Sequence, residues 1–90
     1  MKTTTTLSLT LAATLFAGAA LAAPVCTKEP QSKWMSEADM KARIAKDGYK
    51  VNVFKNTGSC YEIYGLDKDG KKVEIYFNPV DGAIFKQRIG

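Results

Sequence analysis

The sequence predicts an α+β domain in which one N-terminal helix packs on a four-stranded antiparallel β-meander. Two observations lead to this prediction. Alternating apolar and polar residues occupy 60–66 and 71–78, on either side of a polar turn. A single amphipathic run, residues 37–47, precedes them and ends at Gly48. We expect the helix to cover one face of the sheet and to leave the other face open.

The central hairpin has the clearest pattern. Its turn, residues 67–70, reads Asp-Lys-Asp-Gly, which is typical of a type I turn followed by a glycine bulge. If Asp67 pairs with Lys71 the register is fixed, because a slip of one residue would turn every side chain to the other face. The expected pairs are Tyr61–Phe77, Ile63–Ile75 and Gly65–Val73 on the apolar face, and Glu62–Tyr76, Tyr64–Glu74 and Leu66–Lys72 on the other.

The predicted helix has recognisable start and stop signals. Ser36 is expected to cap the backbone amide of Asp39, and Gly48 suits the left-handed position that follows a last helical turn. Met40 and Ile44 lie on the side that we expect to pack on the sheet.

The first strand, within residues 49–54, alternates in the manner of a half-buried strand. We expect Val53 to pair with Tyr61. Val51 then lies opposite Ile63, and the apolar faces of the two strands meet.

The last strand, residues 83–89, has an ambiguous phase. Ile84 should join the core, yet strict alternation then leaves Phe85 outside and turns Lys86 inward. A bulge near Gly82 or an early end of the strand would resolve this conflict, and the sequence does not choose between them.

The first 22 residues have the pattern of a secretory signal peptide. Lys2 precedes an apolar run at 7–21, and Ala-Leu-Ala at 20–22 is a small-x-small cleavage site. The apolar run is too short for a membrane span, which needs about 20 apolar residues. We expect cleavage after Ala22, a periplasmic location, and no membrane span in the mature chain, residues 23–90.

The two cysteines of the chain, Cys26 and Cys60, are expected to form a disulfide, because an exported protein meets an oxidising compartment. A redox-active pair is the alternative, but the sequence has neither a C-x-x-C motif nor a histidine. Residues 23–33 contain Pro24 and Pro30 and are expected to form an extended N-terminal arm, tied down only at Cys26.

Composition excludes several kinds of chemistry. The formal net charge is +4, but acids and bases are interleaved, so we expect no nucleic-acid partner. The absence of histidine rules out histidine acid–base catalysis and histidine metal ligation. The glycine of the Asp-Lys-Asp-Gly turn comes too early for a calcium loop of the EF-hand type. We therefore expect no catalytic residues, no metal site, no cofactor and no enzymatic activity.

The sheet face opposite the helix is the candidate site for a partner protein. The hairpin register places Glu62, Tyr64, Glu74 and Tyr76 on it. Tyrosine is favoured at protein interfaces, because its ring is apolar and its hydroxyl is polar. The alternative is a solvated face whose tyrosine–glutamate pairs only stabilise the sheet. An open face offers no cleft in which the paired carboxylates could hydrolyse a glycoside.

Several short segments resemble a known family. They are Trp34-Met35-Ser36, Asp47-Gly48-Tyr49, Cys60-Tyr61-Glu62, Asp67-Lys68-Asp69-Gly70-Lys71 and Tyr76-Phe77-Asn78-Pro79-Val80-Asp81-Gly82. Over about residues 34–87 the chain resembles the PepSY domain, in particular the short, exported, stand-alone members found in proteobacteria. This resemblance implies a helix packed on an antiparallel sheet and a non-enzymatic role. It also implies binding or restraint of peptidases, which has been proposed from related domains in metallopeptidase propeptides.

These expectations define three segments, namely a signal peptide (1–22), the N-terminal arm (23–33) and a PepSY-like domain (34–90). The sequence contains no peptidase domain, so any restraint would act on a separate protein. The first functional hypothesis is a periplasmic binding module that modulates or inhibits a peptidase or another envelope protein. The alternative is an envelope stress protein that binds a small molecule or a metal.

Overall fold

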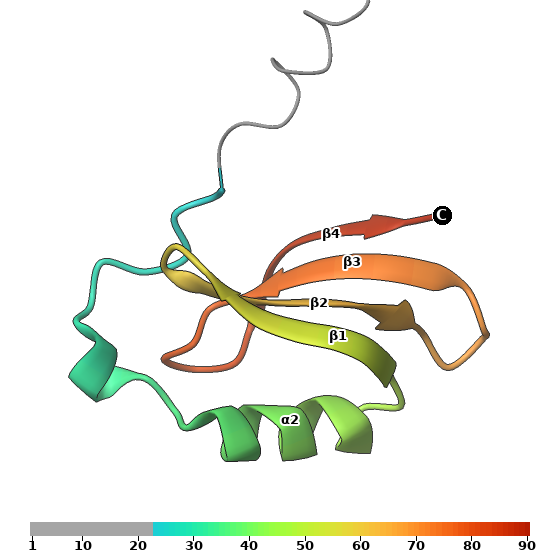
Figure 1. The fold of residues 1–90 in the computed structure, drawn as a ribbon, viewed down its shortest axis with the longest axis horizontal. Coiled ribbons are helices and arrows are strands. Elements are labelled where there is room, and N and C mark those ends of the chain that lie inside the picture. Colours follow the sequence, from blue (N-terminus) through green and yellow to red (C-terminus); the bar gives the residue numbers. More distant parts are fainter. Residues whose placement is uncertain (1–22) are drawn as a thin grey trace, which may run out of the picture.

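The computed structural model describes residues 23–90, so the predicted signal peptide lies outside the described residues. The first elements of the described chain are a 3₁₀ turn, η2 (Gln31–Lys33), and one helix, α2 (Glu37–Lys46). The strands that follow are β1 (Lys50–Thr57), β2 (Cys60–Leu66), β3 (Lys72–Phe77) and β4 (Ile84–Ile89). They form one antiparallel sheet in chain order, and α2 lies along one side of it (Figure 1). The predicted α+β meander is confirmed.

Helix α2 begins and ends close to the predicted positions. The Asp39 amide donates to Ser36 Oγ at 3.0 Å, and Gly48 follows the helix with φ +96°. Met40 and Ile44 are buried against the sheet, as expected for the inner side of an amphipathic helix. No helix within residues 23–90 is long and apolar enough to cross a membrane.

The β2–β3 hairpin has the predicted register at every pair. The Asp67 amide donates to the Lys71 carbonyl at 2.9 Å, and Gly70 has φ +82°. The Asp67 carboxylate also accepts from the amides of Asp69 and Lys71, which fixes the turn. The apolar face of the hairpin joins α2 in one core formed by Met40, Ile44, Tyr61, Ile63, Val73, Ile75 and Phe77.

The pairing of β1 with β2 differs from the prediction. Val53 lies opposite Tyr64 and not Tyr61, because β1 extends to Thr57 and pairs there with Cys60 across a tight turn. A β-bulge between Val51 and Val53 then changes the register by one residue. The bulge reverses the alternation that follows it. Val53 is therefore 47% exposed, and Phe54 packs against the core in its place.

The start of β1 is also shifted from its expected partner. Val51 lies opposite Gly65 and not Ile63. Gly65 permits this close pairing, because a Cβ at that position would collide with the backbone carbonyl of Lys50. Only a residue without a side chain fits between the two strands here.

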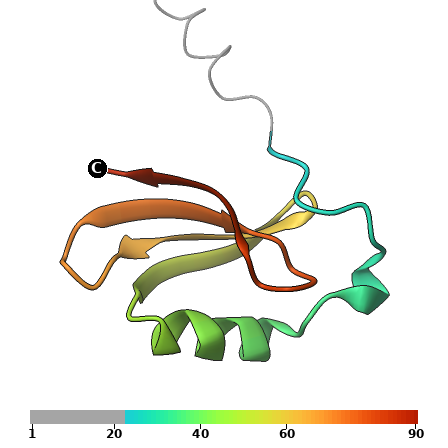
Figure 2. The ribbon, with the colours of Figure 1, turned by 180° about the vertical axis from the view of Figure 1, so that it is seen from behind.

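Strand β4 contains a bulge, one of the two solutions left open by the sequence. Ile84 lies opposite Phe77 and Lys86 opposite Tyr76, so Phe85 is the extra residue, three positions after Gly82. Ile84 does not enter the core as predicted, since it is 42% exposed. Helix α2 lies nearest to β1 and farthest from β4, which explains this exposure (Figure 2).

The N-terminal arm is held at more points than the predicted single attachment at Cys26. It starts on the side of the sheet away from α2 and passes around the end of the sheet to reach the helix (Figure 1). The Trp34 indole N–H donates to the Glu29 carbonyl at 3.3 Å, and just after the arm the Met35 amide donates to the Pro79 carbonyl at 2.8 Å. Within residues 23–33 only Cys26 is buried, so the rest of the arm lies at the surface.

Candidate partner-binding face

The four predicted site residues lie together on the side of the sheet away from α2. Glu62 pairs with Tyr76, and Tyr64 pairs with Glu74. Side chains directly opposite in an antiparallel pair lie close enough to interact. Because the sequence analysis names Glu62, Tyr64, Glu74 and Tyr76 as the candidate site for a partner, we call this group the partner-binding face.

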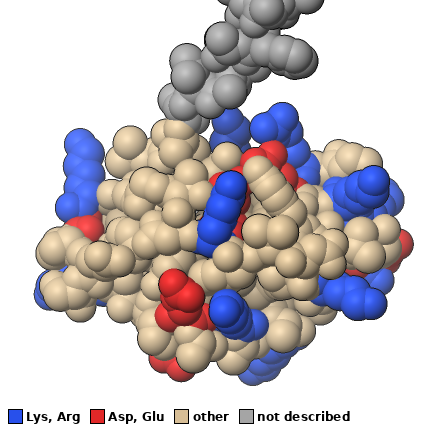
Figure 3. All heavy atoms as spheres, in the orientation of Figure 1, with Lys and Arg blue, Asp and Glu red and all other residues tan. Residues whose placement is uncertain are grey.

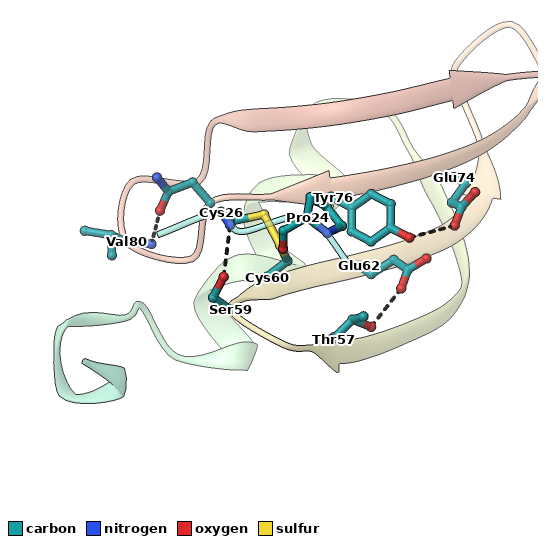
Figure 4. Close-up of a disulfide and its surroundings, with 10 residues drawn as sticks. Pro24, Cys26, Thr57, Ser59, Cys60, Glu62, Glu74, Tyr76 and Val80 are labelled. Carbon is teal, nitrogen blue, oxygen red and sulfur yellow. Dashed lines mark hydrogen bonds between the residues drawn. A yellow bond between two sulfur atoms is a disulfide. The ribbon is translucent and has the colours of Figure 1, made fainter. Parts of the chain in front are cut away.

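Glu62 is buried within this group, with only 2% of its surface exposed. Its Oε1 accepts from the Thr57 hydroxyl at 2.7 Å, and the ammonium group of Lys55 lies 3.9 Å away (Figure 4). Both neighbours belong to β1, and the sequence pattern did not single them out. A partner cannot contact Glu62 directly, so its role is to support the side chains around it.

Glu74 is held by two donors from neighbouring positions. Its Oε2 accepts from the Tyr76 hydroxyl at 3.2 Å, and its Oε1 forms an ion pair with Arg88 of β4 at 3.0 Å. The pKa of Glu74 is lowered, first by hydrogen bonding with Glu62 and then by Tyr76 and the Arg88 charge, against the opposing effect of burial. Glu74 is therefore ionised at neutral pH.

One oxygen of the buried Glu62 carboxylate is left without a partner. Its Oε2 has no hydrogen-bond donor among residues 23–90, whereas Oε1 is held by Thr57 and Lys55.

Tyr64 and Tyr76 are half-buried, and their hydroxyl groups face this acidic pair. Burial first, and then the nearby Glu62 and Glu74, together raise the pKa of each hydroxyl to about 12. The Lys55 ammonium lies 5.3 Å from the centre of the Tyr64 ring. Both hydroxyl groups thus remain hydrogen-bond donors throughout the physiological pH range.

The raised pKa values predict that two tyrosines ionise at a higher pH than free tyrosine when the protein is titrated with base. Tyr64 and Tyr76 should ionise near pH 12 in the folded protein, as followed by ultraviolet absorbance of tyrosinate. Since the unfolded chain releases these protons near pH 10, the folded state loses stability as the pH rises from about 10 to 12. Replacing either residue with phenylalanine should remove one late-titrating group. Ionisation of both residues near pH 10 would contradict the prediction.

The predicted disulfide between Cys26 and Cys60 is present, with both residues buried and an S–S distance of 2.05 Å. The Cys26 amide donates to Ser59 Oγ at 2.9 Å, and the Pro24 carbonyl oxygen lies 3.2 Å from Cys60 Sγ. Cys60 precedes Glu62 on the same side of β2, so the arm borders the partner-binding face (Figure 4).

Other surface features lie away from this face. A depression of about 360 Å³ occurs beside the C-terminal end of α2, lined by Asp47, Tyr49, Asp67, Lys68, Asp69 and Ile84. Within residues 23–90, no group of three or more His, Cys, Asp or Glu side chains is placed to hold a metal ion. Positive and negative side chains are interleaved over the surface drawn in Figure 3.

The fold and the site define the chain as a small, disulfide-linked α+β domain with an acid–tyrosine cluster on its uncovered sheet face. The family model described as peptidase propeptide and YPEB domain matches residues 6–88. The chain therefore belongs to this family, the PepSY domains, which are propeptide- and inhibitor-type binding domains. Comparison with curated proteins and with solved structures gave no match.

Proposed function

We propose that the protein is a non-enzymatic binding module of the periplasm that restrains a peptidase or another envelope protein. The family match carries this proposal, because it covers residues 6–88 and the family takes its description from peptidase propeptides. A propeptide domain acts by binding its peptidase, and a separate chain with the same fold can bind as a second molecule.

Export by a signal peptide, residues 1–22, and cleavage after Ala22 are part of the same proposal. The buried disulfide supports an oxidising compartment. The intact mass of protein recovered from the periplasm should correspond to residues 23–90, with two hydrogens fewer than the reduced chain. A mass that includes residues 1–22 would contradict the cleavage.

The partner-binding face supplies the contact surface in this proposal. Tyr64 and Tyr76 present rings that are partly exposed, while Glu62 and Glu74 beneath them fix the positions of their hydroxyl groups. Preorganised tyrosines give contact area and a hydrogen-bond donor at small entropic cost. The core face of the sheet cannot serve this purpose, because α2 covers it.

Combined replacement of Tyr64 and Tyr76 by alanine should abolish capture of the partner. Central interface tyrosines commonly contribute about 2 kcal/mol or more each, so loss of both should lower affinity by about 1,000-fold. The measurement is capture of peptidases from a periplasmic extract by the immobilised oxidised protein, followed by inhibition assays on each captured peptidase. Urea unfolding of the double variant checks that the domain remains folded.

Two comparisons make this test specific. The Tyr64→Phe/Tyr76→Phe variant keeps both rings and should lose less affinity than the alanine variant. Lys46→Ala alters an exposed residue of α2, which covers the opposite face of the sheet, and should leave capture unchanged. Full capture by the alanine variant would exclude this face. Binding of zinc, copper or haem more tightly than micromolar would favour the small-molecule or metal alternative.

A further inference from the structure

Strand β4 is one edge of the sheet, and its outer side has no partner strand among residues 23–90. The Gly90 amide donates to the Lys72 carbonyl at 2.8 Å, so the backbone groups of Gly90 point toward β3. Because this direction alternates along an antiparallel strand, Arg88 also points toward β3. The N–H and C=O groups of Gln87 and Ile89 therefore point outward, where an added strand could pair with them.

The same strand carries apolar surface that the domain leaves uncovered. Ile84, Phe85 and Ile89 are 42%, 52% and 55% exposed. Within residues 23–90 the other large hydrophobic side chains with comparable exposure are Val25 and Val53, so most of this surface lies on one short strand. Ile84 and Ile89 lie on the α2 side of the sheet, because their partners on β3 are core residues.

The other side of β4 is basic. Lys86 lies opposite Tyr76, and Arg88 lies opposite Glu74, its ion-pair partner. Among residues 23–90, no carboxylate lies within ion-pair distance of Lys86. The edge therefore combines outward-facing backbone groups with an apolar side toward α2 and a cationic side away from it.

A second copy of β4 is a poor match for this edge. If two β4 strands pair antiparallel with their apolar sides together, a basic residue of one copy (Lys86 or Arg88) lies opposite a basic residue of the other. This holds for registers centred on Lys86, Gln87 or Arg88. Like charges directly opposite each other destabilise a strand pair. Charge complementarity favours an acidic segment instead.

We propose that the edge of β4 binds an extended segment of another protein in which acidic and apolar side chains alternate. The acidic side chains lie beside Lys86 and Arg88, and the apolar side chains contact Ile84 and Ile89. The main chain of the segment pairs with Gln87 and Ile89. This surface adjoins the partner-binding face at Lys86 and Arg88, but strand addition is read at Gln87 and Ile89, so the two proposals can fail independently.

The test uses the oxidised protein and two end-blocked heptapeptides. One has the sequence Thr-Val-Glu-Val-Glu-Val-Thr, and the other has lysine in place of each glutamate. Titrations are followed by ¹⁵N-NMR at low and high salt. We expect the acidic peptide to shift the amides of Gln87 and Ile89 and to bind at least about 10-fold more tightly than the basic peptide. Because charges contribute, this difference should shrink at high salt.

Variants of β4 separate strand addition from non-specific attraction. Gln87→Pro removes an outward-facing N–H and spares the bonds to β3, a position at which an edge strand tolerates proline. It should weaken binding of the acidic peptide by at least about 10-fold. Lys86→Glu should reverse the preference between the peptides. Lys46→Glu, the same charge change on α2, is the matched control and should leave the preference intact.

Several results would overturn the proposal. These are no shift at β4 with acidic peptide up to about 1 mM, equal affinity for both peptides, or shifts confined to Tyr64 and Tyr76. A dimer in sedimentation equilibrium that Gln87→Pro dissociates would assign the edge to a second copy of the chain instead.

Discussion

Replacement of Tyr61 by alanine is expected to lower the free energy of unfolding by about 3–5 kcal/mol. Tyr61 is 5% exposed, and its ring lies 5.5 Å from that of Trp34 and 5.2 Å from that of Phe54, measured between centroids. Its hydroxyl donates to the Met35 carbonyl at 2.8 Å. Alanine would leave a cavity between α2, β1 and the segment before the helix, and would leave that carbonyl without its donor.

Urea unfolding followed by circular dichroism measures this effect, and two variants act as controls. Tyr61→Phe keeps the ring and removes one hydrogen bond, so it should cost about 1 kcal/mol. Val53→Ala changes an exposed residue and should cost less than about 0.5 kcal/mol. If Tyr61→Ala cost no more than Val53→Ala, the assignment of Tyr61 to the core would be wrong.

Replacement of both Cys26 and Cys60 by serine should lower the free energy of unfolding by about 2–5 kcal/mol. The disulfide closes a loop between residues 34 positions apart in a chain whose core is small. In the loop-entropy account, most of this effect comes from the larger freedom of the unfolded chain. Small domains are stable by only about 5–15 kcal/mol, so a variant near the lower limit would be partly unfolded at 37 °C.

Chemical reduction provides the matching experiment. The reduced natural protein and the double serine variant should have similar unfolding midpoints, because both lack the cross-link. Ser59→Ala removes only the acceptor for the Cys26 amide and should cost about 1 kcal/mol. A double serine variant as stable as the oxidised protein would show that the arm is held by its other contacts alone.

The hairpin could be predicted from the sequence because its signals are local. The Asp67–Gly70 turn and the alternation on both sides of it determine every pair between β2 and β3. The bulge between Val51 and Val53 has no such signal, since regular alternation continues through it in the sequence. The bulge arises from tertiary packing, in which Phe54 contacts Tyr61 and Gly65 admits the Lys50 carbonyl.

The sequence predicted which residues share the uncovered side of the hairpin, but it did not predict which of them are exposed to solvent. Strand parity places Glu62 on the same side as Tyr64. Its contacts with Lys55 and Thr57 were not predicted, because the tight turn between β1 and β2 sets a register three residues from the expected one. The ion pair of Arg88 with Glu74 could not be predicted either. It depends on which side of β4 Arg88 occupies, and that side is set by an extra residue that the sequence does not locate.

The Cys26–Cys60 bridge also determines how the domain would carry mechanical tension. A pull applied ahead of Cys26 passes through the two sulfur atoms into β2 and bypasses residues 27–59. Helix α2 and β1 lie inside that covalent loop, so the load does not act along either of them. Cys60 and Gly90 lie at opposite ends of the sheet, so a pull between the arm and the C-terminus shears β4 along β3 and loads the hydrogen bonds between these strands together.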